Sequence, residues 1–201
     1  NDLQQELVSN VAVFKNVSSL TGGQIFQGTG VRLPLNYIEV NNISSQQVVN
    51  NTVSTQCGDT TLYSTTSSFY FGAGTYKTFI DINVTALSAG ASWAQVYLYQ
   101  DTPPSQTLIR GSTFVTTQAQ TMGHLFIDGY FYLCKAAEIS IRVDTFGKYK
   151  VGNPTALLLQ SLSADSSLTT SLTQQMKLSA CNISMYIEKV SDSALPAINR
   201  L

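Results

Sequence analysis

The strongest constraint on the fold is a period-two alternation of apolar and polar residues between Phe69 and Val143. The clearest segments read FYFGAGTYKTFIDINVTA, SWAQVYLYQD, LIRGSTFVTT and GHLFIDGYFYLCKAAEISIRVD. Each is closed by Gly, Pro, Asp or Ser, and such alternation is typical of antiparallel strands with one buried face. About eight strands separated by regularly spaced turns predict an all-β antiparallel β-sandwich of the jelly-roll type rather than a βαβ fold.

The same alternation predicts which side chains form the core. The residues expected to face inward are Tyr76, Ile80, Ile82, Val84, Val96, Leu98, Leu125, Ile127, Phe131, Leu133, Ile139, Ile141, Val143, Cys181, Ile183, Met185 and Ile187. Asp128-Gly129 interrupts one of these strands and predicts a β-bulge. Pro34, in the strand-like run VRLPLNYIEV, predicts an edge strand or a bulge because proline cannot donate to a sheet ladder.

The N-terminal segment differs from the rest because it is rich in helix formers. Residues recur at spacings of four and three at Leu3, Leu7, Asn10, Phe14 and Val17. This spacing predicts either a short coiled-coil stalk or a single amphipathic helix or frayed end, and Gly22-Gly23 would stop any helix. We therefore expect residues 1–23 to form a stalk or linker, residues 24–190 a jelly-roll head domain and residues 191–201 a loose C-terminal tail.

Composition excludes several kinds of partner. Charged residues make up only 11% of the chain, against roughly a quarter in an ordinary soluble domain. A net charge of -1 and a pI near 5.7 predict no basic patch for nucleic acid or for an anionic membrane. No apolar run approaches the roughly 20 residues of a membrane span. The Ser-, Thr-, Asn- and Gln-rich polar component is typical of extracellular and virion proteins.

The residues that usually carry catalysis or bind metals are scarce. His124 is the only histidine, and no GxSxG, GxGxxG or P-loop motif is present. Three cysteines, Cys57, Cys134 and Cys181, have no CxxC spacing, so we expect small buried thiols and no zinc site. We expect no enzyme activity, no metal ion and no cofactor. A glycan-cleaving domain, with carboxylates brought together by the fold, and a calcium site in the loops remain alternatives.

Aromatic side chains opposite the expected core face suggest a subunit interface. They are Phe79, Trp93, Tyr97, Tyr99, Tyr130 and Tyr132. Large rings with a polar tip are favoured at protein interfaces, so we interpret this set as a trimer interface. The alternative interpretation is that loops cover both faces of the sandwich.

Four segments carry a resemblance to a known family. They are GAGTYKTFIDINVTA, WAQVYLYQD, GHLFIDGYFYLCKAAEISIRVD and the closing ACNISMYIEKV, between roughly Tyr63 and Val190. Their order resembles the tumour-necrosis-factor-like and complement-type globular heads, and the viral fibre or spike heads built on the same jelly roll. The resemblance implies a binding module without catalytic residues. It also implies a homotrimer, preceded in viral members by a helical or fibrous stalk.

Loops are the expected place for ligand binding, because the core strands are buried and the six outward aromatic residues are assigned to the trimer interface. The candidates are Asp101 and Gln106, which flank the stiff Pro103-Pro104 pair, together with Lys148 and Tyr149. The lysine and the tyrosine would suit hydrogen bonding to a sugar and stacking on it. A groove between subunits is the alternative site.

These expectations combine into one functional hypothesis and two alternatives. The hypothesis is a receptor-binding head of a viral fibre or spike, located on the virion surface or outside the cell, that attaches to a host receptor, which is a protein or a glycan. The alternatives are a secreted complement-head or TNF-like binding module and a glycan-cleaving sandwich domain. Sequons for N-glycosylation, which suggest a eukaryotic secretory route, occur at Asn16, Asn42, Asn50, Asn83 and Asn182.

Overall fold

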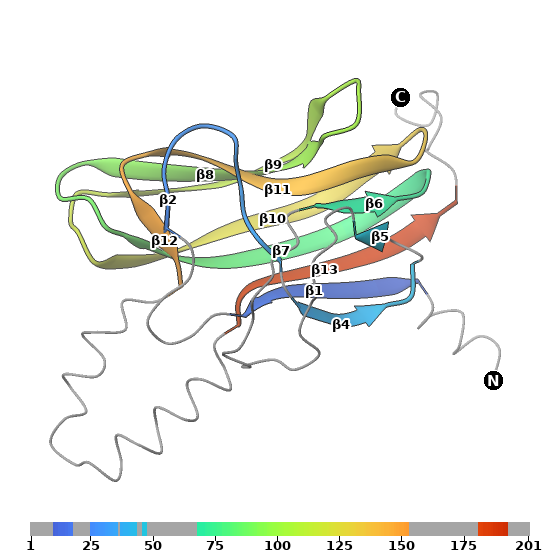
Figure 1. Cartoon of the computed structure of the whole chain (residues 1–201), viewed down its shortest axis with the longest axis horizontal. Coiled ribbons are helices and arrows are strands. Elements are labelled where there is room, and N and C mark those ends of the chain that lie inside the picture. Colours follow the sequence, from blue (N-terminus) through green and yellow to red (C-terminus); the bar gives the residue numbers. More distant parts are fainter. Residues whose placement is uncertain are drawn as a thin grey trace, which may run out of the picture.

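The computed structural model describes residues 10–17, 25–35, 37–43, 46–47, 68–152 and 181–192, and it consists of two antiparallel sheets packed face to face (Figure 1). Sheet A contains β1 (Val11–Val17), β2 (Ile25–Phe26), β4 (Tyr37–Asn41), β7 (Gly74–Ala86), β10 (Thr121–Leu133), β12 (Tyr149–Val151) and β13 (Cys181–Ser191). Sheet B contains β3 (Val31–Arg32), β5 (Gln46–Gln47), β6 (Phe69–Phe71), β8 (Ser92–Gln100), β9 (Gln106–Thr116) and β11 (Ala137–Phe146). The prediction of an all-β sandwich is confirmed.

The order of the strands is that of a jelly roll. In sheet A, β13 lies between β1 and β7, β4 lies beyond β1, and β10 pairs with the other edge of β7 (Figure 1). In sheet B, β11 pairs with β8, and β8 pairs with β9. Chain-adjacent strands therefore alternate between sheets in several places, so residues far apart in the sequence become neighbours.

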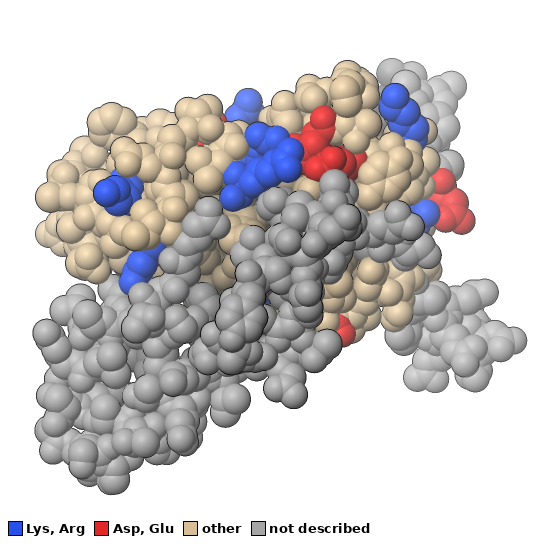
Figure 2. Space-filling view, viewed as in Figure 1, with Lys and Arg blue, Asp and Glu red and all other residues tan. Residues whose placement is uncertain are grey.

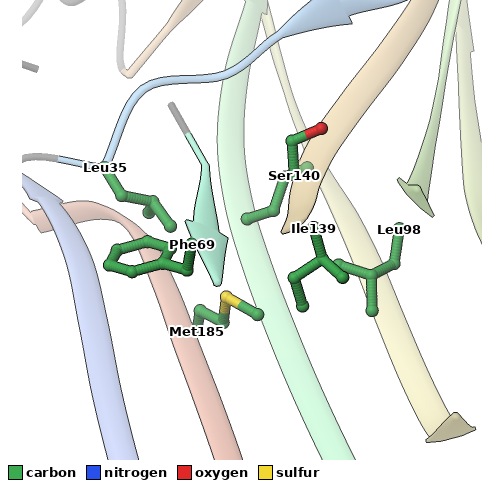
Figure 3. Close-up of a pocket in the computed structure, with 7 residues that line it drawn as sticks. Leu35, Phe69, Leu98, Ile139, Ser140 and Met185 are labelled. Carbon is green, nitrogen blue, oxygen red and sulfur yellow. The ribbon is translucent and has the colours of Figure 1, made fainter. Parts of the chain in front are cut away.

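The core lies between the sheets and contains the side chains that the alternation predicts. Every expected inward residue whose side chain is described is at most 2% exposed. Figure 3 shows part of this layer, where Leu98 and Ile139 of sheet B face Met185 of sheet A. The gap that these side chains line, together with Leu35 and Phe69, leaves no room for a water molecule. This part of the interior is thus packed rather than hollow, as expected for a protein core.

The predicted helix is wrong for the described part of the N-terminal segment, where Val11–Val17 forms β1. Ala12, Phe14 and Asn16 are buried at a spacing of two, and β1 is hydrogen-bonded to β13 on one side and β4 on the other. Because this strand is part of sheet A, the head domain does not begin at residue 24 as expected. Residues 1–9 and 18–24, and residues 193–201 of the expected tail, lie outside the described residues.

Two further local predictions need correction. The run VRLPLNYIEV is not one strand, because the chain crosses at Pro34 from β3 in sheet B to β4 in sheet A. The expected bulge at Asp128-Gly129 is absent, since β10 pairs with β7 without a shift from Thr121 to Leu133. A Cβ at Gly129 would lie 3.7 Å from Ile109 of β9, which is an ordinary van der Waals contact.

Candidate binding surfaces

The six aromatic residues predicted to form one interface lie on two opposite faces of the sandwich. Phe79 of β7 and Tyr130 and Tyr132 of β10 occupy positions that alternate with core residues of sheet A. Trp93, Tyr97 and Tyr99 of β8 occupy the corresponding outward positions of sheet B. Packed sheets are about 10 Å apart, so these two groups cannot belong to one continuous surface. The prediction of a single interface made by all six residues is wrong.

The outer face of sheet A carries four exposed rings, which we call the aromatic face: Phe79, Phe126, Tyr130 and Tyr186. Between 37% and 53% of each residue is exposed. Phe79 pairs directly with Tyr186 on β13, and with Asp128 on β10. Directly opposite residues have Cβ atoms about 5 Å apart and diagonal neighbours lie within about 7–8 Å, so Phe126 and Tyr130 flank Phe79. The four rings therefore form one patch across three strands.

Polar groups surround this patch. His124 stacks on Phe126 with 6.4 Å between ring centroids, and its Nδ1 lies 3.4 Å from Oδ1 of Asp81. The hydroxyl of Tyr186 donates to Glu188 at 3.4 Å, and the pKa of Tyr186 is raised mainly by burial and also by this carboxylate. An apolar centre with a polar rim is the usual composition of a protein–protein interface.

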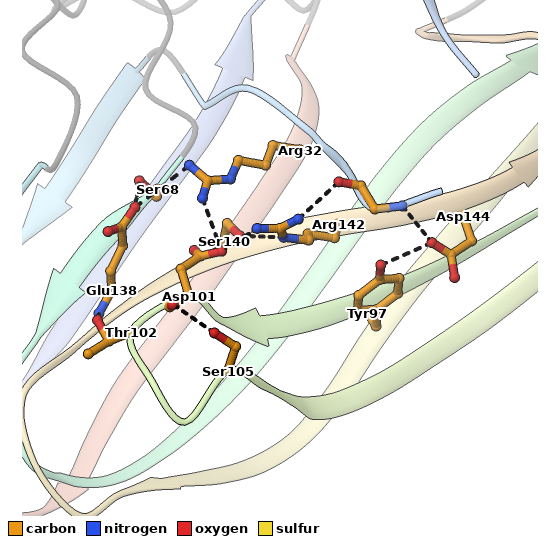
Figure 4. A network of polar contacts seen from close by, with 11 residues as sticks. Arg32, Ser68, Tyr97, Asp101, Thr102, Ser105, Glu138, Ser140, Arg142 and Asp144 are labelled. Atoms are coloured by element: carbon orange, nitrogen blue, oxygen red, sulfur yellow. Dashed lines mark hydrogen bonds and ion pairs between the residues drawn. The ribbon is translucent and has the colours of Figure 1, made fainter. Parts of the chain in front are cut away.

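The outer face of sheet B carries a network of charges that satisfy one another (Figure 4). Asp101 accepts hydrogen bonds from Arg32 at 3.2 Å and from Arg142 at 2.5 Å, and only 6% of its side chain is exposed. Arg142 also donates to Ser140 at 3.3 Å and to the carbonyl oxygen of Gly30 at 3.1 Å. Each of the three guanidinium nitrogens of Arg142 (Nε, Nη1 and Nη2) therefore already donates a hydrogen bond within the protein.

The same network holds two of the predicted interface tyrosines. Tyr97 donates to Oδ1 of Asp144 at 3.0 Å, and the backbone N–H of Gly30 donates to the same oxygen at 2.7 Å. Burial, and then the hydrogen bond to Asp144, raise the pKa of Tyr97 to about 12. The ring of Tyr99 lies 4.6 Å below the guanidinium carbon of Arg142. Tyr97 and Tyr99 thus support the network and are not available as open apolar rings.

The network fastens separate segments together rather than presenting free charges. Figure 2 shows its basic and acidic side chains side by side on this face. Arg32 also lies 3.7 Å from Glu138, which accepts a hydrogen bond from Ser68 at 2.8 Å. Oδ2 of Asp101 is buried without a hydrogen-bond partner, so this one oxygen of the network is left unsatisfied. We interpret the network as a structural clamp between β3, β11 and the loop after β8.

The residues predicted to bind a ligand do not form one site. Asp101 lies in the clamp, and Gln106 is exposed at the start of β9. Lys148 is exposed near the other end of the sandwich, where its N–H donates to Ser88 at 2.8 Å. Because β8 has nine residues at about 3.3 Å each, the two ends are separated by more than 25 Å.

The prediction that Tyr149 binds a ligand at the surface is wrong, because this residue is 0% exposed. It belongs to β12, which pairs with β7, and its ring stacks on Phe26 with 6.0 Å between centroids. Its hydroxyl lies 2.9 Å from the hydroxyl of Ser92, and burial raises its pKa. The short KYKV sequence gave too little alternation to distinguish a buried strand from a loop.

The cysteine prediction is also corrected in part, since Cys134 is free and exposed in the turn between β10 and β11. Cys57 and the side chain of Cys181 lie outside the described residues. Among the residues that the structure describes, no group of three or more His, Cys, Asp and Glu could hold a metal ion. Within the same part of the chain, no helix has the length and apolarity to cross a membrane.

Comparison with known proteins identifies the fold. No family model matches the chain, and no curated protein does. Among solved structures, the chain is similar to Eiger TNF from S. frugiperda, with a TM-score of 0.50 and 12% sequence identity. The match covers 94% of this chain and 96% of that chain. The fold is a TNF-like jelly roll.

This comparison confirms the expected jelly roll, and at 12% identity it concerns the fold alone. In this TNF-like jelly roll the four rings of the aromatic face lie on sheet A, and sheet B carries the charge clamp and, near one end of β8 and β11, the exposed rings of Trp93 and Phe146. Sequence reasoning missed Phe126 and Tyr186 as members of the aromatic face, although both occupy outward positions of alternating segments. It also missed the clamp, because no local pattern links Arg32, Asp101 and Arg142.

Proposed function

We propose that this chain is a non-enzymatic, extracellular, TNF-like binding module that assembles as a homotrimer through the aromatic face. The observation that supports the proposal is the contiguity of four exposed rings on β7, β10 and β13. Exposed apolar patches with polar rims mark interaction sites, and aromatic side chains contribute most to interface energy. A trimer is the assembly that the resemblance to TNF-like heads implies.

Sheet B is the less suitable interface because its central charges are already paired. Opening the clamp to contact a partner would leave Asp101 buried beside unpaired arginines, which is costly. Asp101 and Glu138 share Arg32, so these two carboxylates are not free to flank a sugar as in a glycosidase. This supports a binding role over glycan cleavage.

The partner of the trimer would be a cell-surface receptor, bound by loops or at a groove between subunits. A viral fibre or spike head that attaches to a host protein or glycan from the virion surface is a narrower form of the same proposal. It rests on the resemblance stated above. Upstream sequence separates the two forms: a fibre shaft or capsid anchor indicates the viral head, and collagen-like repeats indicate the secreted one.

The test of assembly is sedimentation equilibrium of the isolated chain at micromolar concentration. Three subunits of 21.8 kDa give a trimer of about 65 kDa. Replacing Phe79 with lysine should produce a folded monomer, because the added charge lies in the middle of the aromatic face. Trp93→Lys is the matched control: Trp93 is 40% exposed on sheet B, and this variant should remain trimeric. A monomeric wild type, or equal dissociation of both variants, would refute the proposal.

A further inference from the structure

Three exposed apolar side chains lie next to one another on the outer face of sheet B, at the end where β8 begins. Trp93 of β8 pairs with Phe146 of β11 on one side and with Val115 of β9 on the other (Figure 1). They are 40%, 61% and 67% exposed, respectively. Neighbouring strands are about 4.8 Å apart, so these residues form a row about 10 Å long, which we call the Trp93 platform.

The backbone that carries the platform is held in place. The N–H of Thr145, the neighbour of Phe146, donates to the carbonyl oxygen of Gly28 at 2.7 Å, and the N–H of Gly28 donates to the hydroxyl of Thr145 at 2.9 Å. Gly147 packs on the start of β8, since a Cβ there would lie 2.8 Å from Cβ of Ser92. A ligand therefore meets a surface that is already formed, so binding requires little ordering of the backbone.

The platform is too small to hold a second copy of the chain or another folded protein. At 40% and 61% exposure, Trp93 and Phe146 together offer on the order of 200 Å². A stable protein–protein interface buries about 800 Å² on each partner. The apolar surface cannot extend along β8 and β11, because Tyr97 and Arg142, which pair with each other further along, belong to the charge network. A ligand with a small, flat apolar face fits this area better.

Groups that form hydrogen bonds lie beside the platform on the same face of sheet B. Gln95 pairs with Asp144 and with Thr113, and each of the three is two residues from a member of the platform. The hydroxyl of Tyr97 and the N–H of Gly30 both donate to Oδ1 of Asp144, so neither bond uses Oδ2 (Figure 4). An amide, a hydroxyl and a carboxylate oxygen are suitable partners for the hydroxyl groups of a sugar.

The charge beside the platform favours an uncharged ligand. The carboxylate of Asp144 would repel an acidic sugar, whereas it would accept hydrogen bonds from the hydroxyls of a neutral one. The nearest cation along the chain, Lys148, lies where the chain crosses to sheet A, and its carbonyl oxygen accepts from the N–H of Leu87 at 2.7 Å.

We propose that the Trp93 platform binds a neutral oligosaccharide, with sugar rings stacked on Trp93 and Phe146 and with sugar hydroxyls bonded to Gln95 and Asp144. A sugar ring has C–H groups on its faces and hydroxyls at its rim, and the electron-rich face of an aromatic ring attracts such C–H groups. This inference rests on the binding role proposed above but not on the trimer, because the platform and the aromatic face lie on different sheets.

The test begins with a glycan array of neutral and sialylated oligosaccharides, probed with the fluorescently labelled full chain. The full chain is then titrated with lactose, cellobiose, diacetylchitobiose and the neutral glycans that give the strongest array signals. Trp93 is the only tryptophan of the chain, so a sugar stacked on it should change the tryptophan emission in a saturable way. Calorimetry measures the same binding in variants that lack Trp93.

Trp93→Ala and Phe146→Ala should each weaken binding by about tenfold or more, because each removes one stacking ring. Tyr70→Ala is the matched control, since Tyr70 is 41% exposed on the outer face of sheet B and pairs with Glu138. Glu138 and Phe146 are eight residues apart on β11 (146 minus 138), which places Tyr70 about 26 Å from the platform. All three variants should melt within a few degrees of the wild type, because exposed side chains are replaced.

The absence of saturable binding to any neutral glycan would overturn the proposal, and so would binding of sialylated glycans alone. Equal weakening by Tyr70→Ala and Trp93→Ala would also overturn it, as would a protein partner that binds through Trp93 after its glycans have been removed. Phe79→Lys, which should dissociate the trimer, should bind the sugar with the wild-type constant per chain. A monomeric wild type that binds the sugar would refute only the trimer, and a trimer that binds no sugar would refute only the platform.

Discussion

Replacing Tyr149 with alanine should strongly lower the melting temperature, because both the ring and the hydroxyl of Tyr149 are buried. The ring contacts Phe26 and Phe114, and the hydroxyl is hydrogen-bonded to Ser92. Truncating a buried aromatic ring costs about 3–5 kcal/mol, and losing the hydrogen bond adds about 1 kcal/mol. For a chain of this length, each kcal/mol lowers the melting temperature by about 2–4 °C, so the expected decrease is roughly 10–20 °C.

Two matched variants separate the causes in this experiment. Tyr149→Phe keeps the ring but leaves Ser92, which is 1% exposed, without its partner, so we expect a loss of about 1–3 kcal/mol. Lys148→Ala changes the exposed neighbour and should alter stability by no more than about 0.5 kcal/mol. Thermal denaturation followed by circular dichroism, together with urea titration, measures all three. If Tyr149→Ala melted at the same temperature as Lys148→Ala, the placement of β12 in the core would be wrong.

Two further predictions concern the outer face of sheet B. Arg142→Ala should lower the free energy of unfolding by about 3 kcal/mol in urea titration, the lower end of the range for a broken buried ion pair, because Arg32 still contacts Asp101. The exposed Arg110 is the control, and a change as small as that of Arg110→Ala would contradict the clamp. The pKa of Tyr97 rises from 10.0 to about 12 on folding, so its contribution to stability is complete below pH 10 and is lost as the pH rises towards 12. The melting temperature of the wild type should fall across that pH window, and the melting temperature of Tyr97→Phe should fall less steeply. Equal slopes of melting temperature against pH in the two proteins would exclude Tyr97 as a cause.

Most strands could be predicted from the sequence because period-two alternation is a local property that matches a two-faced sheet. It identified β7, β8, β10 and β11 and their buried residues without knowledge of their partners. It failed at Val11–Val17, where Phe14 and Val17 fit a helical spacing and Ala12, Phe14 and Asn16 fit a strand. Pairing with β13 decides between the two, and that partner lies near the other end of the chain.

The candidate surfaces were only partly predictable for a related reason. Outward rings such as Phe126 follow from the alternation, but the sequence does not say which sheet each strand joins, so rings from both faces were combined. Ion pairs are still less visible, since Asp101 is 69 residues from Arg32 and 41 residues from Arg142. Such distant partners have no sequence pattern that could reveal them.

The position of β13 also determines when sheet A can form during protein synthesis. Cys181 pairs with Val17, which was made 164 residues earlier (181 minus 17), a stretch that takes a ribosome roughly 8–33 s at about 5–20 residues per second. Until Met185 arrives between Phe14 of β1 and Ile80 of β7, these apolar side chains lack the neighbour that joins them. The nascent chain must keep the edge of β1 open for that whole interval, and the edge of β7 open from its own synthesis onward, and exposed edges invite aggregation. Sheet A therefore cannot be completed strand by strand as the chain leaves the ribosome; it closes when the final strand inserts.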